Sequence, residues 1–220
     1  MGGGPAGLAV AIGAARRGLS TLVLEARPSP LDKACGEGIL PAGVRALEEL
    51  GVAVSGRPID SVRWIDGGGA YAEALLPDGG GLGVRRTRLV EALHARALAE
   101  GAVVRSGVRV RTHLRTRAGV ALLTDGERFD AGVLVAADGL TSPLRHAEGL
   151  DVPSRGPRRF GMRRHFAVRP WSSSVEVHLG EGMEAYVTPV GEQLVGVAIL
   201  FDESARAGAS FDALLARVPS

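Results

Sequence analysis

Several residue types that carry common protein chemistry are scarce in this chain of 220 residues. Cys35 is the only cysteine, which excludes an internal disulfide framework and a cysteine-based zinc site. No His-Glu-x-x-His spacing and no G-x-S-x-G sequence occurs, which argues against a zinc protease and against a serine hydrolase of the α/β class. Aromatic residues make up 4% of the chain, so its core must be aliphatic. The sequence therefore favours chemistry that needs neither a metal nor a protein nucleophile.

An excess of charge of one sign is also absent. The 26 basic residues, of which Lys33 is the only lysine, are nearly balanced by 24 acidic residues. We therefore expect no nucleic-acid partner. The apolar stretch LAVAIGAA is too short to span a bilayer, and Arg16 and Arg17 follow it instead of preceding it, so we expect neither a membrane segment nor a signal peptide. A single cysteine fits a reducing compartment, so we expect a cytoplasmic protein, while the oligomeric state stays open.

The chain opens with MGGGPAGLAVAIG, in which Gly2, Gly4 and Gly7 form a G-x-G-x-x-G loop that enters a helix expected over residues 5–18. Such glycines let the backbone approach a pyrophosphate, whose charge the helix amino end stabilises. The apolar run STLVLE follows and ends in Glu25, where an acid accepts hydrogen bonds from ribose hydroxyls. Together these features predict dinucleotide binding, although Glu25 alone is equally typical of a solvated strand end.

The remaining patterns predict an α/β fold in two regions. Continuous apolar runs at 20–25 and 131–139 are typical of buried parallel strands, and residues 86–101 form an amphipathic helix pattern. Residues 108–117 alternate, which predicts an antiparallel strand with a solvated basic face. After about residue 155, four strand-like runs predict an antiparallel sheet. We expect a Rossmann-like domain over 1–150 that lacks its first strand and carries a β-hairpin near 58–77, then an incomplete antiparallel substrate domain over 151–220.

Three motifs together resemble a known superfamily. They are GGGPAG with Glu25, the RxxL pattern from Arg86 to Leu89, and the ADG..S..R pattern that contains Asp138 and Gly139. The chain resembles the FAD-dependent oxidoreductases that include the group A monooxygenases and the geranylgeranyl reductases. The G-W-x-W-x-I-P signature of flavin halogenases is absent from the sequence.

The resemblance implies roles for individual residues. The glycine loop with Pro5 and Ala6 would hold the FAD pyrophosphate, and Glu25 the adenosine ribose. Arg86 would contact the FAD phosphate or ribose, and Val108 would lie near the adenine. Alternatives stay open, because Arg86 also suits a surface position at a helix start. The complete set of implied cofactor-binding residues is Gly2, Gly4, Pro5, Ala6, Gly7, Glu25, Lys33, Gly36, Arg86, Val108, Asp138 and Gly139.

The loop DKACGEG resembles the geranylgeranyl-reductase branch, in which this connection lies near the flavin. Lys33 would offset phosphate charge and Gly36 would let the loop pass close to the ring, whereas Cys35 is as easily a small buried thiol. The first functional hypothesis is an NAD(P)H-dependent monooxygenase that hydroxylates a small organic substrate through a flavin hydroperoxide. The second is a flavin-dependent alkene reductase, and the third is a truncated, inactive nucleotide-binding relative. No catalytic side chain is indicated.

The resembled enzymes have an apolar strand before the glycine loop and a Gly-Asp motif after the region that this chain covers. Burial of each aliphatic side chain contributes about 1.5–3 kcal/mol, so loss of a central strand approaches the whole stability of a domain, about 5–15 kcal/mol. We therefore expect a fragment or truncated gene product that binds FAD weakly and is marginally soluble.

Overall fold

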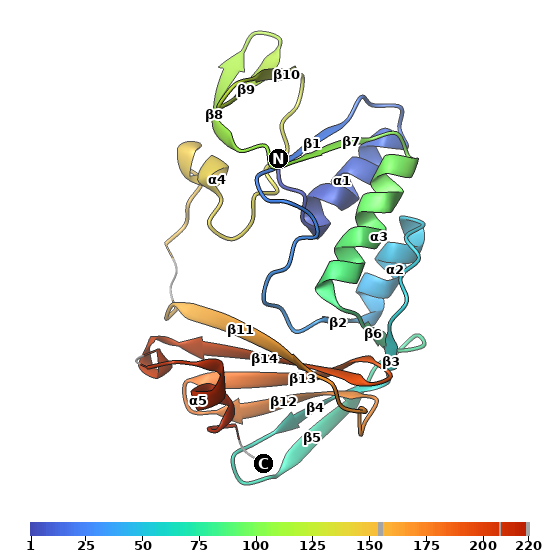
Figure 1. The fold of residues 1–220 in the computed structure, drawn as a ribbon, viewed down its shortest axis with the longest axis vertical. Helices are drawn as coiled ribbons and strands as arrows, with labels where there is room; N and C mark the ends of the chain where they lie inside the picture. The colour runs from blue at the N-terminus through green and yellow to red at the C-terminus, as the bar shows by residue number, and fades with distance from the viewer. Residues whose placement is uncertain (154–155, 207, 219–220) are drawn as a thin grey trace. The chain divides into compact units, whose positions relative to one another are not determined.

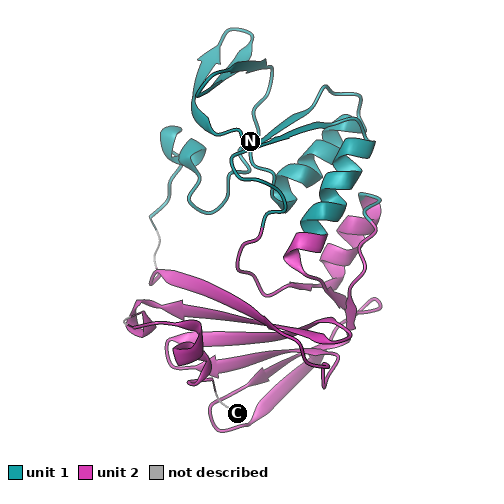
Figure 2. Cartoon of the chain, in the orientation of Figure 1, with its two compact units in different colours: residues 1–31, 50–52, 89–153 teal, residues 32–49, 53–88, 154–220 magenta. Residues whose placement is uncertain are grey.

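The computed structural model describes residues 1–153, 156–206 and 208–218. Figure 2 shows that the chain forms two compact units, each assembled from separated stretches. Unit 1 contains residues 1–31, 50–52 and 89–153, and unit 2 contains residues 32–49, 53–88 and 154–220.

Unit 1 is an α/β unit with two small sheets (Figure 1). Strands β1 and β7 pair in parallel. Parallel pairing needs a crossover connection between the strands, and helix α3 precedes β7 here. Strands β8, β9 and β10 form an antiparallel meander. The elements are α1 (Pro5–Ala15), β1 (Leu22–Glu25), α3 (Arg86–Ala99, with residues 89–99 in this unit), β7 (Val103–Ser106), β8 (Val110–Thr116), β9 (Gly119–Thr124), β10 (Arg128–Ala131) and α4 (Pro143–Ala147).

Helix α1 begins where its sequence predicts. Pro5 occupies its first turn, where a missing N–H costs nothing. Leu8 and Ile12 are fully buried and lie one turn apart on the same face of the helix. Beyond its carboxyl end, Arg16 donates a hydrogen bond of 2.7 Å to Glu100, the residue after α3.

Two expectations for unit 1 are wrong in detail. Residues 132–139 do not form a strand, and Val133 is 80% exposed. A strand needs a hydrogen-bonded neighbour, and the contacts here are two bonds with Met1: its amino group donates to the Val135 carbonyl, and the Ala137 amide donates to the Met1 carbonyl.

In the alternating segment 108–117, a register irregularity between Val110 and Thr112 reverses the faces of β8. Val108 and Val110 are half-buried as expected, but beyond the irregularity His113 is half-buried and Leu114 is 50% exposed. The basic face is therefore not uniformly solvated.

Unit 2 centres on a six-stranded sheet in the order β11-β14-β13-β12-β4-β5. The four strands expected after residue 155 are present and antiparallel. The expected hairpin is also present as β4 and β5, and β4 joins the same sheet by pairing in parallel with β12. The elements are β2 (Gly38–Ile39), α2 (Pro41–Glu49), β3 (Arg57–Ile59), β4 (Ser61–Ile65), β5 (Tyr71–Leu75), β6 (Gly81–Gly83), the first turn of α3, β11 (Arg159–Phe166), β12 (Ser174–Gly180), β13 (Met183–Gly191), β14 (Leu194–Asp202), η1 (Glu203–Ala205) and α5 (Phe211–Leu215).

One half of this sheet has an aliphatic and aromatic core on one face. Ile199 and Phe201 of β14 are almost fully buried, and α5 covers them with Phe211 and Leu214. Ser210 caps α5 by accepting a hydrogen bond from the Ala213 amide. Among the described residues, no helix is both long and apolar enough to cross a membrane.

Candidate functional site

Two of the three loop glycines are required by packing within unit 1. Gly2 has φ of +103°, and a Cβ there would lie 2.1 Å from the carbonyl oxygen of Ala137. A Cβ on Gly7 would lie 1.9 Å from the carbonyl oxygen of Gly2. The Gly2 amide also donates to the Leu24 carbonyl at 2.9 Å, which ties the loop to β1. The protein's own backbone therefore explains glycine at both positions.

Gly4 differs from its neighbours. Its φ of −77° and ψ of 178° suit any residue, and apart from the adjacent residues no atom of the described chain would lie within 4 Å of a Cβ there. Pro5 and Ala6 follow as the first residues of α1, whose first-turn amides lack partners one turn back and whose amino end carries partial positive charge. The loop thus presents an open, backbone-lined and electropositive surface at Gly4.

Glu25 lies at the end of β1 beside this loop. Its Oε2 accepts a hydrogen bond of 2.7 Å from the Gly3 amide, and its Oε1 accepts one of 2.9 Å from the Arg27 amide. The Val108 amide donates to the Glu25 carbonyl, and its half-buried side chain packs beside Leu24. The structure brings these expected residues together in unit 1.

Asp138 and Gly139 precede α4 and organise its start. Asp138 accepts hydrogen bonds from the Ser142 hydroxyl at 2.6 Å and the Leu144 amide at 3.1 Å. Ser142 in turn accepts from the Arg145 amide and so forms the N-cap, with Pro143 next to it in the first turn. Gly139 has φ of +95°, so the turn itself requires glycine. The acid therefore has a structural role that the motif alone does not reveal.

Asp138 and Gly139 also line an open cavity of about 490 Å³ in unit 1. Its other walls include His113 and Glu148, which hydrogen-bond to each other at 2.5 Å. Hydrogen bonds from Arg115 first and His113 second hold the pKa of Glu148 below its usual range. The glycine loop is not part of this lining, but it lies beside it, since a Cβ on Gly2 would be 3.1 Å from the Asp138 amide nitrogen.

The expected residues of unit 2 gather around the loop of residues 32–37. Lys33 is exposed, and Gly36 is half-buried with its carbonyl accepting a 2.7 Å hydrogen bond from the Thr188 hydroxyl. The Arg86 amide, at the start of α3, donates to Glu37 Oε1 at 2.8 Å. Glu37, which follows Gly36 in the chain and accepts from the Arg86 amide, therefore links these two expected residues.

Glu37 was not among the residues expected from the sequence, and neither were its partners Arg163 and His165. The Glu37 side chain is 1% exposed and accepts hydrogen bonds from Arg163 at 2.5 Å and His165 at 2.6 Å. The Arg163 side chain is itself only 8% exposed, so its charge is held inside unit 2 by this carboxylate. The available signal was the i, i+2 spacing of Arg163 and His165, which puts both on one face of β11.

Tyr186 of β13 lies next to this loop, since a Cβ on Gly36 would lie 3.9 Å from its side chain. The Tyr186 hydroxyl donates to Glu184 at 2.5 Å. Burial, and secondly this hydrogen bond, raises the pKa of Tyr186 to about 12. The described residues contain no cluster of three or more His, Cys, Asp or Glu side chains suited to a metal ion.

Comparison with known proteins finds relatives that match most of the chain. The family described as FAD binding domain matches residues 1–195. Menaquinone reductase of Mycolicibacterium smegmatis is 29% identical over 90% of this chain and 53% of its own length. The 3-hydroxybenzoate 6-hydroxylase 1 of Aquipseudomonas alcaligenes is 32% identical over 66% of this chain and 40% of its own length.

Among solved structures, the flavin-dependent halogenase CmlS matches with a TM-score of 0.85 at 20% identity, over 99% of this chain and 44% of that one. At this identity the likeness establishes the fold. The chain spans about half the length of the curated relatives it matches.

Proposed function

Because the chain belongs to the FAD binding domain family, we propose that it binds FAD and acts as an FAD-dependent oxidoreductase. In unit 1, Gly2, Gly4 and Gly7 with the backbone of Pro5 and Ala6 would hold the pyrophosphate. Glu25 would hold the adenosine ribose, Val108 would lie near the adenine, and Asp138 and Gly139 would complete this half. In unit 2 the proposed contacts are Lys33, Gly36 and Arg86.

The observation that carries the proposal is the open space at Gly4. Packing and backbone conformation account for Gly2 and Gly7, but no protein atom requires glycine at position 4. A pyrophosphate drawn against the amino end of α1 would occupy the space that a Cβ would take, and the first-turn amides would donate to its oxygens. The residues present thus fit the diphosphate of FAD.

Glu25 fits the ribose for a related reason. An ionised carboxylate has about four acceptor sites, and two of those on Glu25 are taken by the amides of Gly3 and Arg27. These bonds fix the carboxylate without exhausting it. The remaining sites are available to two ribose hydroxyls.

For the activity, we propose an NAD(P)H-dependent monooxygenase that acts on a small organic substrate in the cytoplasm, by the oxygen-activation route expected from the sequence. Bound flavin supplies the redox chemistry by accepting a hydride and passing reducing equivalents on. The residues of the chain hold and orient it. The similarity to a hydroxylase supports this proposal.

The similarity to menaquinone reductase and the CGEG sequence of residues 35–38 support a flavin-dependent reductase as the second candidate. Fast oxygen consumption stimulated by a small aromatic substrate would favour the monooxygenase. Alkene reduction under anaerobic conditions would favour the reductase. If added FAD gives no NAD(P)H oxidation at all, the chain is an inactive binding relative.

Titration with FAD, followed by flavin fluorescence, tests the cofactor proposal. Glu25→Ala should abolish most of the affinity, but it also removes the acceptor for the Gly3 amide, so the melting temperature must be measured without FAD. Glu25→Gln keeps an oxygen for that amide and should show a smaller loss. Asp130→Ala is the matched control, because Asp130 is an exposed acid that pairs with Arg128 within the same unit. Equal FAD affinity for wild type and Glu25→Ala would refute the ribose assignment.

A further inference from the structure

The buried carboxylate of Glu37 has three hydrogen-bond partners in unit 2. It accepts from the Arg86 amide at 2.8 Å, from Arg163 at 2.5 Å and from His165 at 2.6 Å. Hydrogen bonds to charged groups contribute about twice as much as neutral ones. A carboxylate this well satisfied tolerates burial, whereas loss of its partners would leave an unpaired charge.

The backbone at Glu37 is held in a conformation that a non-glycine residue rarely adopts. Its φ is +59°, in the left-handed region. Such a conformation persists only where the surrounding structure determines it. Both main-chain and side-chain contacts do so here, because the Glu37 carbonyl also accepts a 2.8 Å hydrogen bond from the Val84 amide.

The sheet is shaped to receive this carboxylate and its loop. A Cβ on Gly196 of β14 would lie 3.0 Å from Glu37 Oε2, so glycine there leaves room for it. Arg163 reaches the other end of the loop as well, donating to Asp32 at 2.5 Å. Together with the Thr188 bond to the Gly36 carbonyl, these contacts fasten both ends of residues 32–37.

We propose that Glu37 is a positioning residue, which through Arg163 and His165 pins the loop of residues 32–37 to β11 and fixes the amino end of α3 at the same point. The inference rests on the proposed function in one respect: the pinning would serve to hold Gly36 and Arg86 in place for contact with FAD. The pinning itself is a property of unit 2 and is testable without FAD.

Cys35 provides a reporter inside the loop, because it is half-buried and is the only thiol in the chain. Its rate of alkylation by iodoacetamide should be measured across pH for wild type and Glu37→Gln. The thiolate is the reactive form, so a change in ionisation moves the midpoint of the profile, whereas a change in exposure moves its plateau. We expect the plateau to rise at least about fivefold in Glu37→Gln, and Glu37→Asp to restore part of the protection.

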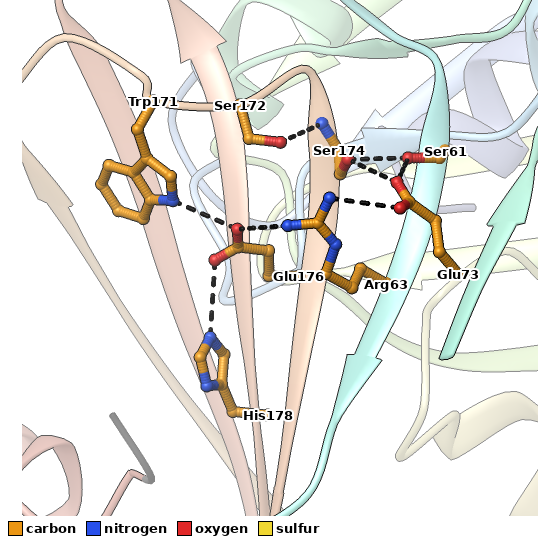
Figure 3. A network of polar contacts seen from close by, with 8 residues as sticks. All are labelled: Ser61, Arg63, Glu73, Trp171, Ser172, Ser174, Glu176 and His178. Carbon is orange, nitrogen blue, oxygen red and sulfur yellow. Dashed lines mark hydrogen bonds and ion pairs between the residues drawn. The ribbon is translucent and has the colours of Figure 1, made fainter. Parts of the chain in front are cut away.

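Glu176→Gln is the matched control, since Glu176 is a buried carboxylate in β12 of the sheet on which the loop packs. Figure 3 shows it among Arg63, Trp171 and His178, with Trp171 Nε1 donating to it at 3.1 Å. It pairs with Val187, and the next residue of β13, Thr188, holds Gly36, so Glu176 lies on the opposite face from the loop. Its loss should leave the Cys35 plateau within twofold of wild type.

Gly196→Ala makes the test independent of the charge change. The added methyl displaces the Glu37 carboxylate without altering any ionisable group, and should raise the plateau about two- to threefold. A plateau within twofold of wild type in both folded Glu37→Gln and Gly196→Ala would overturn the proposal, and if Glu37→Gln fails to fold, Gly196→Ala decides alone. If FAD fails to bind the wild type, the proposed function falls while the labelling result stands.

Discussion

Gly4→Ala and Gly7→Ala are expected to affect different properties: Gly7→Ala should lower the stability of the protein, and Gly4→Ala should lower its affinity for FAD. At Gly7 the added Cβ would lie 1.9 Å from the Gly2 carbonyl oxygen, so the loop must move. Forced overpacking costs about 1–3 kcal/mol. For a chain of this length that lowers the melting temperature by roughly 2–12 °C, because each kcal/mol corresponds to about 2–4 °C. We expect Gly7→Ala to lose stability even without FAD.

At Gly4 the new methyl meets no described protein atom. The helix loses a favourable N-cap residue, which costs about 1 kcal/mol, so the melting temperature should fall by only about 2–4 °C. FAD affinity should fall, because the methyl would take the place of the pyrophosphate. Loss of one charged hydrogen bond, about 1.5–3 kcal/mol, weakens binding by about 10- to 150-fold.

Two measurements separate the variants: the melting temperature without FAD, and the FAD dissociation constant from flavin fluorescence. FAD that binds the folded state should also raise the melting temperature of wild type, and at the same concentration this rise should be much smaller for Gly4→Ala. Gly4→Ala with wild-type FAD affinity would show that the open space at Gly4 has no part in binding, and the reasoning would fail.

Two further predictions concern residues with clear local roles. Asp138→Ala removes acceptors for Ser142 and Leu144; the expected loss, about 1–2 kcal/mol, should appear in thermal melts without FAD, and an unchanged melting temperature would count against the capping role. In the folded state the pKa of Tyr186 is raised to about 12, above its ordinary value of about 10. The stabilisation linked to this shift is therefore fully present below pH 10, and the free energy of unfolding falls as the pH rises from 10 to 12. In an absorbance titration of the two tyrosines, Tyr186→Phe should remove a step near pH 12, and ionisation of Tyr186 near pH 10 in the folded protein would contradict its burial.

The sequence predicts the local elements of this fold well. Helix α1 is marked by Pro5 in its first turn, and strands β11 to β14 are marked by the turn signals between them. These signals act over a few residues, so neighbouring side chains suffice to specify them. The glycine loop and Glu25 are also adjacent in the structure, because helix α1 and strand β1, which join them, return the chain to the loop.

Features that depend on distant partners were not predictable in the same way. The face of β8 reverses at a register irregularity between Val110 and Thr112, which alternation alone does not reveal. Residues 132–139 have the composition of a strand, but composition does not supply a hydrogen-bonded neighbour strand. Glu37 reads as a loop residue, and only the fold shows that Arg163 and His165 surround it.

The parallel pairing of β4 with β12 has a consequence during synthesis. Ser61 and Ser174, which face each other across this pair, are 113 residues apart. At a synthesis rate of about 5–20 residues per second, β4 waits roughly 6 to 23 seconds for its neighbour to leave the ribosome. Over that interval one edge of the β4–β5 hairpin is open to wrong partners. A chaperone that shields the nascent hairpin should therefore raise the yield of correctly folded chain.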